Sequence, residues 1–160
     1  MKGWRRAWRH TTLRDVAFLT AVPSPQDEID GLIAHVPGND WAALDEREYA
    51  YKRHPATDQT THDLTRSLEV QVYAVPPYEH GNPSAKHPIL LSYLDVVVQG
   101  YLREFGLEGV RQFFQTTDGW DAPILNDRDT PRYPRHQRLN MLEQDLVDGH
   151  LKEVGAGVRL

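Results

Sequence analysis

The sequence contains no cysteine, which excludes disulfides, thiolate nucleophiles and metal sites with cysteine ligands. It also lacks any apolar run of the roughly 18 residues that a membrane-spanning helix needs. The basic N-terminus is not followed by the apolar stretch of a signal peptide, so we expect a cytoplasmic protein with no membrane partner. Basic residues are in deficit as well: the net charge is −5 at pH 7, which does not favour a nucleic-acid partner.

Motifs of cofactor and metal enzymes are missing too. Neither a P-loop nor a Gly-x-Gly-x-x-Gly segment occurs, so a nucleotide cofactor is not expected. The eight histidines form no His-x-x-x-His or His-Glu-x-x-His pair, which favours solvated histidines over a metal site. A Gly-x-Ser-x-Gly elbow is also missing, although spacing alone leaves a Ser/His/Asp triad open. We therefore expect no cofactor and no metal.

The residues that are present fit a single α+β domain spanning positions 1–160. A chain of 160 residues can bury one core, which removes about two-thirds of its unfolded surface from water. Strand-like alternation fills its first half and helical periodicity its second, an order typical of α+β folds. The expected strands are 4–11, 15–23, 28–36 and 66–76, and the expected helices are one beginning at Trp41, 88–105, 107–114 and one from about 136.

The segment WAALDEREYAY, residues 41–51, raises a question because of Glu48. As a helix, it places Glu48 on the same face as Trp41 and Leu44, which should point to the core. One interpretation is that the helix ends early and that Glu48 is solvated and paired with Lys52 at i+4. The other is that Glu48 is an acid/base in a pocket. The residues alone leave both interpretations open.

A basic cluster at the N-terminus runs from Lys2 to Arg9. Trp4 and Trp8 alternate there with arginines, which resembles a surface on which single-stranded nucleic acid stacks. The acidic total favours instead a strand with its tryptophans inward and its arginines outward.

A second basic cluster lies between the expected strands and the last helix. Its members are Arg128, Arg132, Arg135, His136 and Arg138. Such arginines either bind an anionic group of a substrate through bidentate hydrogen bonds, or are solvated, or pair with acidic neighbours. The acidic neighbours in the sequence are Asp121, Asp127 and Asp129.

Several segments, taken in order, resemble the gamma-glutamylcyclotransferase family. Leu44-Asp45-Glu46-Arg47-Glu48 is similar to its Leu-Asp-x-x-Glu segment. Gly3-Trp4-Arg5-Arg6 looks like the family's second strand, and Gly31-Leu32-Ile33 resembles the strand before the acidic helix. Residues 70–75, followed by a proline-rich loop and a helix with Gly100 and Phe105-Gly106, look like its glutathione-degrading branch. The resemblance covers most of residues 3–115.

The resemblance implies a mixed, barrel-like sheet with helices packed outside. It also implies an enzyme that converts a gamma-glutamyl peptide or amine, such as glutathione, into 5-oxoproline and a free amine. Glu48 would be the acid/base, without metal or cofactor. The substrate's own α-amine attacks its γ-carbonyl, so the protein has to hold the chain bent and move a proton. Burial against Trp41 and Leu44 would raise the pKa of Glu48, and Arg128, Arg132 or Arg135 would pair with a substrate carboxylate.

The family also has a Tyr-Gly-Ser-Leu loop whose backbone N–H groups help to stabilise the oxyanion, and this loop does not occur in the sequence. Either the chain start is misassigned or the loop is lost, and such a loss costs about a hundred- to a thousandfold in rate. We then expect the strand at Trp4 to present an unpaired edge through which the chain forms a homodimer. The alternative function is a non-catalytic descendant that binds a small ligand or a protein partner.

Overall fold

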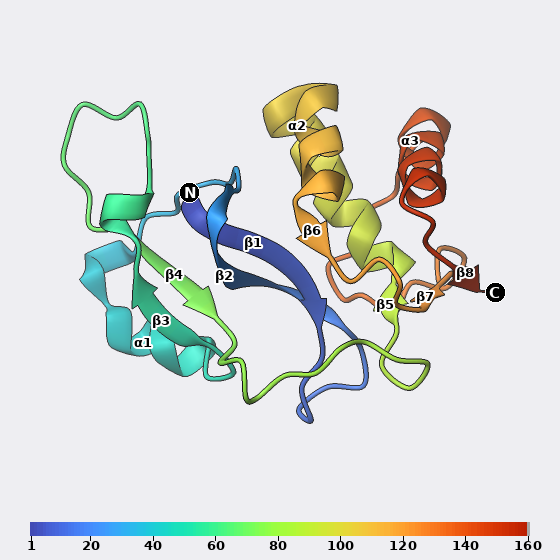
Figure 1. Ribbon diagram of the computed structural model, residues 1–160, viewed down its shortest axis with the longest axis horizontal. Coiled ribbons are helices and arrows are strands. Elements are labelled where there is room, and N and C mark those ends of the chain that lie inside the picture. Colours follow the sequence, from blue (N-terminus) through green and yellow to red (C-terminus); the bar gives the residue numbers. More distant parts are fainter. Residues whose placement is uncertain (160) are drawn as a thin grey trace.

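The structure, a computed structural model, describes residues 1–159 and is an α+β fold, as the order of strands and helices predicts. Figure 1 shows β1 and β2 in the middle of the molecule, with α1, β3 and β4 on one side and α2 and α3 on the other. The elements are β1 (Lys2–Arg9), β2 (Phe18–Glu28), η1 (Pro37–Asn39), α1 (Trp41–Arg47), β3 (Lys52–Pro55), η2 (Thr57–Gln59), β4 (Gln71–Ala74), β5 (Ile89–Leu90), α2 (Leu91–Gln115), β6 (Thr117–Asp118), β7 (Ile124–Leu125), α3 (Met141–Glu153) and β8 (Val158–Arg159).

The central sheet has the order β2-β1-β6. β1 pairs antiparallel with β2 along its length and parallel with the two residues of β6. Trp4 and Trp8 are buried, which confirms that the tryptophans point inward. Arg6 lies on the same face and is also buried, so the expectation that all the arginines point outward is wrong. Its guanidinium is 4.9 Å from the centre of the Tyr101 ring and donates to Thr116 Oγ1 at 2.7 Å.

The edge expected beside Trp4 is therefore partly covered. β6 pairs with β1 at Arg6 and Ala7, and its neighbour Thr116 accepts a hydrogen bond from the backbone of Arg6. Trp8 is fully buried and Trp4 nearly so, so neither tryptophan adds an exposed apolar surface at this edge. Homodimerisation stays a prediction.

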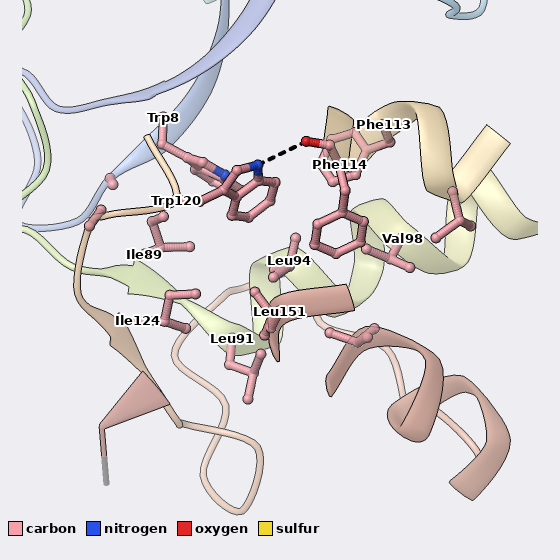
Figure 2. Packing of buried hydrophobic residues seen from close by; sticks show 14 residues of the cluster. Trp8, Ile89, Leu91, Leu94, Val98, Phe113, Phe114, Trp120, Ile124 and Leu151 are labelled. Atoms are coloured by element: carbon pink, nitrogen blue, oxygen red, sulfur yellow. Dashed lines mark hydrogen bonds between the residues drawn. The ribbon is translucent and has the colours of Figure 1, made fainter. Parts of the chain in front are cut away.

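The main core lies between β1, α2 and α3 (Figure 2). α2 is interrupted at Gly106, whose φ of 65° and ψ of −166° suit glycine, and this confirms the predicted helices on either side of that residue. Trp120 packs against Trp8 and Phe114, and its Nε1 donates to the Phe114 carbonyl at 3.0 Å. Within residues 1–159, no helix combines the length and the apolar character needed to cross a membrane.

Two predicted strands differ from the structure. Residues 29–36, all of them described, form no strand after the end of β2, and Leu32 is 72% exposed. The predicted strand 66–76 is reduced to the four residues of β4. Its pairing with β3 reaches Pro55 opposite Gln71; beyond it the Ala56 N–H donates to the Val70 carbonyl at 2.9 Å, but the Val70 N–H donates to the Thr57 hydroxyl at 3.0 Å instead of extending the ladder.

The strands belong to three separate sheets, and none of these closes into a barrel within residues 1–159. Besides the central sheet there is the β3–β4 hairpin and a small parallel sheet with the order β5-β7-β8. The barrel-like sheet implied by the family resemblance is thus not observed, although the α+β class is. The hairpin contacts the central sheet through β2, where the Val75 backbone donates to Thr20 Oγ1 at 3.2 Å.

Candidate functional site

Glu48 ends α1 rather than lying along its face. The Asp40 side chain caps the start of the helix by accepting from the Ala43 N–H at 3.0 Å. Glu48 donates its N–H to Leu44 but has left the helical conformation, with φ of −96° and ψ of 30°. Its side chain is 30% exposed and pairs with the Arg47 guanidinium at 2.9 Å. The expected burial of Glu48 between Trp41 and Leu44 is therefore wrong, because the helix is one residue too short.

The early end of the helix agrees with the interpretation that α1 stops before Glu48. The partner expected for Glu48 in that interpretation, Lys52, does not pair with it. Lys52 at i+4 donates instead to the Tyr78 hydroxyl at 2.7 Å. Arg47, next to Glu48 in the sequence, supplies the positive charge. The arrangement leaves the Glu48 carboxylate half-buried beside a cation rather than in an apolar pocket.

Asp45 fastens α1 to the β3–β4 hairpin. One carboxylate oxygen accepts from the Tyr73 hydroxyl at 2.5 Å and the other from Arg53 at 3.1 Å. Arg53 and Tyr73 face each other across the hairpin, and the Arg53 guanidinium lies 4.7 Å from the centre of the Trp41 ring. Burial, and then the hydrogen bond to Asp45, raise the pKa of Tyr73 to about 12. Asp45 is thus a structural residue.

Two tyrosines lie within electrostatic reach of Glu48. Burial raises the pKa of Tyr51, and the negative charge of Glu48 raises it further, against the opposite effect of Arg14. Glu48 also contributes to the raised pKa of Tyr73. The Tyr51 ring packs edge-on against Phe18 at a centroid distance of 5.9 Å. Phe18 also lines a cavity, so Tyr51 packs behind one residue of the cavity wall.

This cavity, which we call the small cavity, has a volume of about 360 Å³. Its walls come from the loop between β1 and β2 (Arg14 to Phe18), the start of α2, and residues 132–134. Tyr93 stacks on Tyr133 with ring centroids 4.5 Å apart and meets Trp8 edge-on at 5.5 Å. Burial is the main cause of the strongly raised pKa of Tyr93. The small cavity therefore combines a buried phenol, apolar surface and two arginines.

Arg128 is not available to a substrate. Its guanidinium makes a bidentate pair with Asp95, both distances being 2.8 Å, and a further pair with Asp148 at 2.9 Å. Asp95 is only 4% exposed. These bonds raise the pKa of Arg128 against the effect of burial, and they tie the loop after β7 to α2 and α3. The hypothesis that Arg128 binds substrate is thus replaced by a structural role.

Arg132 and Arg135 occupy different places. Arg132 lines the small cavity, and its backbone N–H donates to the buried carboxylate of Asp127 at 2.8 Å. Arg135 is exposed and is not part of the cavity wall. Arg128 is thus structural, Arg132 is exposed at the wall of the small cavity, and Arg135 is exposed away from it.

A second, larger hollow is an open groove of about 1230 Å³. It lies between residues 29–37, α1, residues 60–64 and β4. Much of its lining is apolar, and Leu32 and Leu64 are exposed there. Arg47 lies in its wall, whereas Glu48 lines neither hollow. The groove wall carries several carboxylates, among them Asp30, Asp63 and Glu69, whereas the smaller wall of the small cavity carries two arginines and one aspartate, which makes the small cavity the better candidate for a small anionic ligand.

Comparisons with protein-family models, curated proteins and solved structures find no match. The assignment of function therefore rests on the residues and their geometry. Among residues 1–159, no group of three or more histidine and acidic side chains is placed to hold a metal ion.

Sequence reasoning missed four members of this site. Arg14 lies in a loop without a motif, and Tyr93 looks like one more apolar member of the α2 stripe. Tyr51 lies in the bend between α1 and β3, which begins at Lys52, and no motif marks it. Tyr133 sits in the segment Pro131-Arg132-Tyr133-Pro134, whose two prolines fix a turn-rich loop; this was the one available signal.

Proposed function

We propose that the chain cyclises a gamma-glutamyl peptide or amine to 5-oxoproline and releases the amine. The α-amine of the substrate forms a new C–N bond with its γ-carbonyl carbon, and the C–N bond to the leaving amine breaks. The α-ammonium loses two protons as it becomes the lactam N–H: Glu48 carries the first to the departing nitrogen, and the second ends on the released amine, which leaves as an ammonium ion. Because both reacting groups belong to one substrate, the main task of the protein is to hold them together.

The observation that supports this proposal is the position of Glu48. Its carboxylate is half-buried at the end of α1, beside Tyr51, which packs on the wall of the small cavity. It already binds a cation, the Arg47 guanidinium at 2.9 Å. In the proposed reaction the α-ammonium of the substrate takes the place of Arg47, which brings the proton donor onto the carboxylate. Glutathione and simple gamma-glutamyl amino acids are the substrates to test.

The test compares two glutamates on the same short segment. The purified chain is incubated with gamma-glutamyl amino acids and, separately, with glutathione, and 5-oxoproline is measured. Glu48→Gln should abolish product formation because an amide cannot carry the proton, whereas Glu46→Gln should retain it because Glu46 is exposed. Product formation by the Glu48→Gln variant at the wild-type rate would remove Glu48 from the mechanism.

A second candidate is a non-catalytic protein that binds a small ligand in the same cavity. The ion pair between Arg47 and Glu48 favours it, because a paired and partly exposed carboxylate is a weak base. Arg47→Met frees Glu48 and separates the two candidates. The enzyme proposal expects product from the wild type and at least as much from Arg47→Met. If neither protein forms product while a ligand still raises the melting temperature, the non-catalytic candidate is correct.

A further inference from the structure

We propose that the small cavity binds a carboxylate of the ligand between Arg14 and Arg132, and that Asp127 positions the Arg132 side of this clamp. This inference rests on the proposed function for its choice of ligand, a small gamma-glutamyl compound that enters with its α-carboxylate. The binding site itself is argued from the cavity and its charges.

The two arginines come from parts of the chain far apart in sequence and meet at one cavity. Arg14 is in the loop between β1 and β2, and Arg132 follows the β7 segment. Asp15 also lines the cavity, so its wall carries a net single positive charge. Arginine suits a carboxylate because its planar guanidinium donates two parallel hydrogen bonds to the two oxygens.

The guanidinium groups of Arg14 and Arg132 have no ion-pair partner among residues 1–159. Arg5, Arg53 and Arg128, by contrast, each pair with at least one aspartate within 3.1 Å. The charge of Arg14 nevertheless acts on the buried phenols, because it lowers the pKa of Tyr51 and Tyr93 against the effect of burial. A ligand carboxylate would neutralise the net positive charge of the cavity wall.

The remaining walls limit what fits. Ala17 and Leu90, both buried, and Tyr93 give the cavity an apolar part of its lining. Arg14 and Arg132 are themselves exposed, so the ionic contact would form where the cavity meets solvent. A volume of about 360 Å³ is near the lower end of the roughly 300–1,000 Å³ typical of ligand pockets. The cavity therefore suits a group of the size of the glutamyl head of a substrate.

Asp127 holds the loop that carries Arg132 and Tyr133. Its buried carboxylate accepts from the backbone N–H of Ser92 at 2.8 Å, from the Ser92 hydroxyl at 2.6 Å and from the Arg132 N–H at 2.8 Å. The Tyr133 N–H donates to the Ser92 hydroxyl at 3.3 Å. Arg132 and Tyr133 are thus anchored through Asp127 and through Ser92, which lies in the first turn of α2. This makes Asp127 a positioning residue.

The test measures binding by isothermal titration with 5-oxoproline and with its amide, which lacks the carboxylate. We expect 5-oxoproline to bind the wild type at least tenfold more tightly than the amide. Arg14→Met and Arg132→Met should each weaken 5-oxoproline binding at least tenfold, equal to about 1.4 kcal/mol. Arg135→Met is the matched control and should bind as the wild type does. Melting temperatures near that of the wild type would show that the variants are folded.

A further variant tests the positioning role of Asp127. Asp127→Asn should raise KM for a gamma-glutamyl substrate at least threefold, while kcat changes less. In the double variant, Arg132→Met should raise KM little further, because Asp127 acts by positioning Arg132.

The outcomes distinguish this inference from the proposed function. If binding depends on the carboxylate and needs both arginines, but the protein never forms 5-oxoproline, the clamp is supported and the proposed enzyme activity is overturned. Product formation with an unchanged KM in Arg14→Met and Arg132→Met would support the enzyme and overturn the clamp. Equal affinity for 5-oxoproline and its amide, or no binding of either, would also overturn the clamp.

Discussion

The part of the molecule built on α2 and α3 and the part that carries α1 are held together by different forces. In the helical part, residues 89–154, apolar side chains such as Leu94 and Phe113 are completely buried and the aromatic rings pack on one another. In the α1 part, residues 29–73, the strongest contacts are ionic and polar, above all those of Asp45. Leu32 and Ile33 in that part are exposed.

The difference places the most deeply buried packing beside the small cavity and the more exposed, polar contacts around Glu48. The helical part and the loops anchored to it supply one wall of the small cavity, through Tyr93 and residues 132–134. The α1 part supplies Glu48, which can change partners because neither it nor Arg47 is deeply buried. The scaffold is thus strongest where it shapes the cavity and weakest where the proposed chemistry requires exchange of an ion pair.

The largest expected effect comes from the core of the helical part. Phe113→Ala should lower the free energy of unfolding by about 3–5 kcal/mol because it leaves a cavity among buried rings. Leu32→Ala in the α1 part should change it by less than about 0.5 kcal/mol because Leu32 is 72% exposed. Urea denaturation followed by tryptophan fluorescence measures both, and similar losses in the two variants would break the comparison.

The two parts also differ in what an ion pair contributes. Arg128→Met should cost about 3–5 kcal/mol at pH 7 because it leaves the Asp95 carboxylate buried without its partner. Arg47→Met should cost less than about 1 kcal/mol because Arg47 is 71% exposed.

The pH dependence of the Arg128→Met variant follows from Asp95. Burial already raises the pKa of Asp95, and removal of Arg128 removes the chief opposing effect. A raised pKa in the folded state gives stability that is present below the unfolded pKa and lost as the pH rises through the folded pKa. The loss in Arg128→Met should therefore shrink toward pH 4 in chemical denaturation, whereas a loss that does not vary with pH would point to packing instead.

A smaller effect is expected at the link between α1 and the hairpin. Tyr73→Phe removes the 2.5 Å hydrogen bond to Asp45 and should cost about 1 kcal/mol, since Asp45 is partly exposed. Because the pKa of Tyr73 is raised to about 12, its contribution should be lost as the pH rises from about 10 toward 12. Difference absorption of the phenolate in wild type and variant checks this, and a Tyr73 that titrates near 10 would contradict it.

The smallest effect concerns the loop that crosses the end of β1. Burial, followed by the charge of Arg9, lowers the pKa of His80 below its ordinary 6.5. The contribution of a neutral His80 to stability is present above about pH 6.5 and is lost as the pH falls below it. His80→Asn should therefore flatten the acid side of the stability curve, measured by melting temperature, and an unchanged curve would remove His80 as a cause.

The sequence predicted the features that depend on local patterns. The long apolar stripe predicted α2, the gap between the expected helices 88–105 and 107–114 marked its interruption, and the helix expected to begin at Trp41 is α1. Long-range contacts were not accessible in this way. β6 is two residues long and pairs with a strand more than a hundred residues away. Arg6 alternates in phase with Trp4 and Trp8 and so points to the core, whereas its charge had suggested an exposed side chain.

The candidate site shows the same limit. The resemblance identified Glu48 as the residue of interest, but its contacts depend on where α1 ends, and helix ends are the least certain part of a sequence reading. Arg128 pairs with Asp95 and Asp148 rather than with the aspartates beside it in the sequence. Which arginine is free follows from tertiary packing, and no spacing rule in the segment 128–138 distinguishes them.

Native-state hydrogen exchange tests the contrast between the two parts most directly. The hydrogen-bonded amides of α1 and of the β3–β4 hairpin should exchange by local opening, whereas those of Leu94 and Phe113 in α2 should exchange only on global unfolding. After correction for intrinsic rates, the amides of α1 and the hairpin should exchange at least about a hundredfold faster. Equal protection in α1, the hairpin and α2 would show that the chain opens as a single unit and would contradict the account.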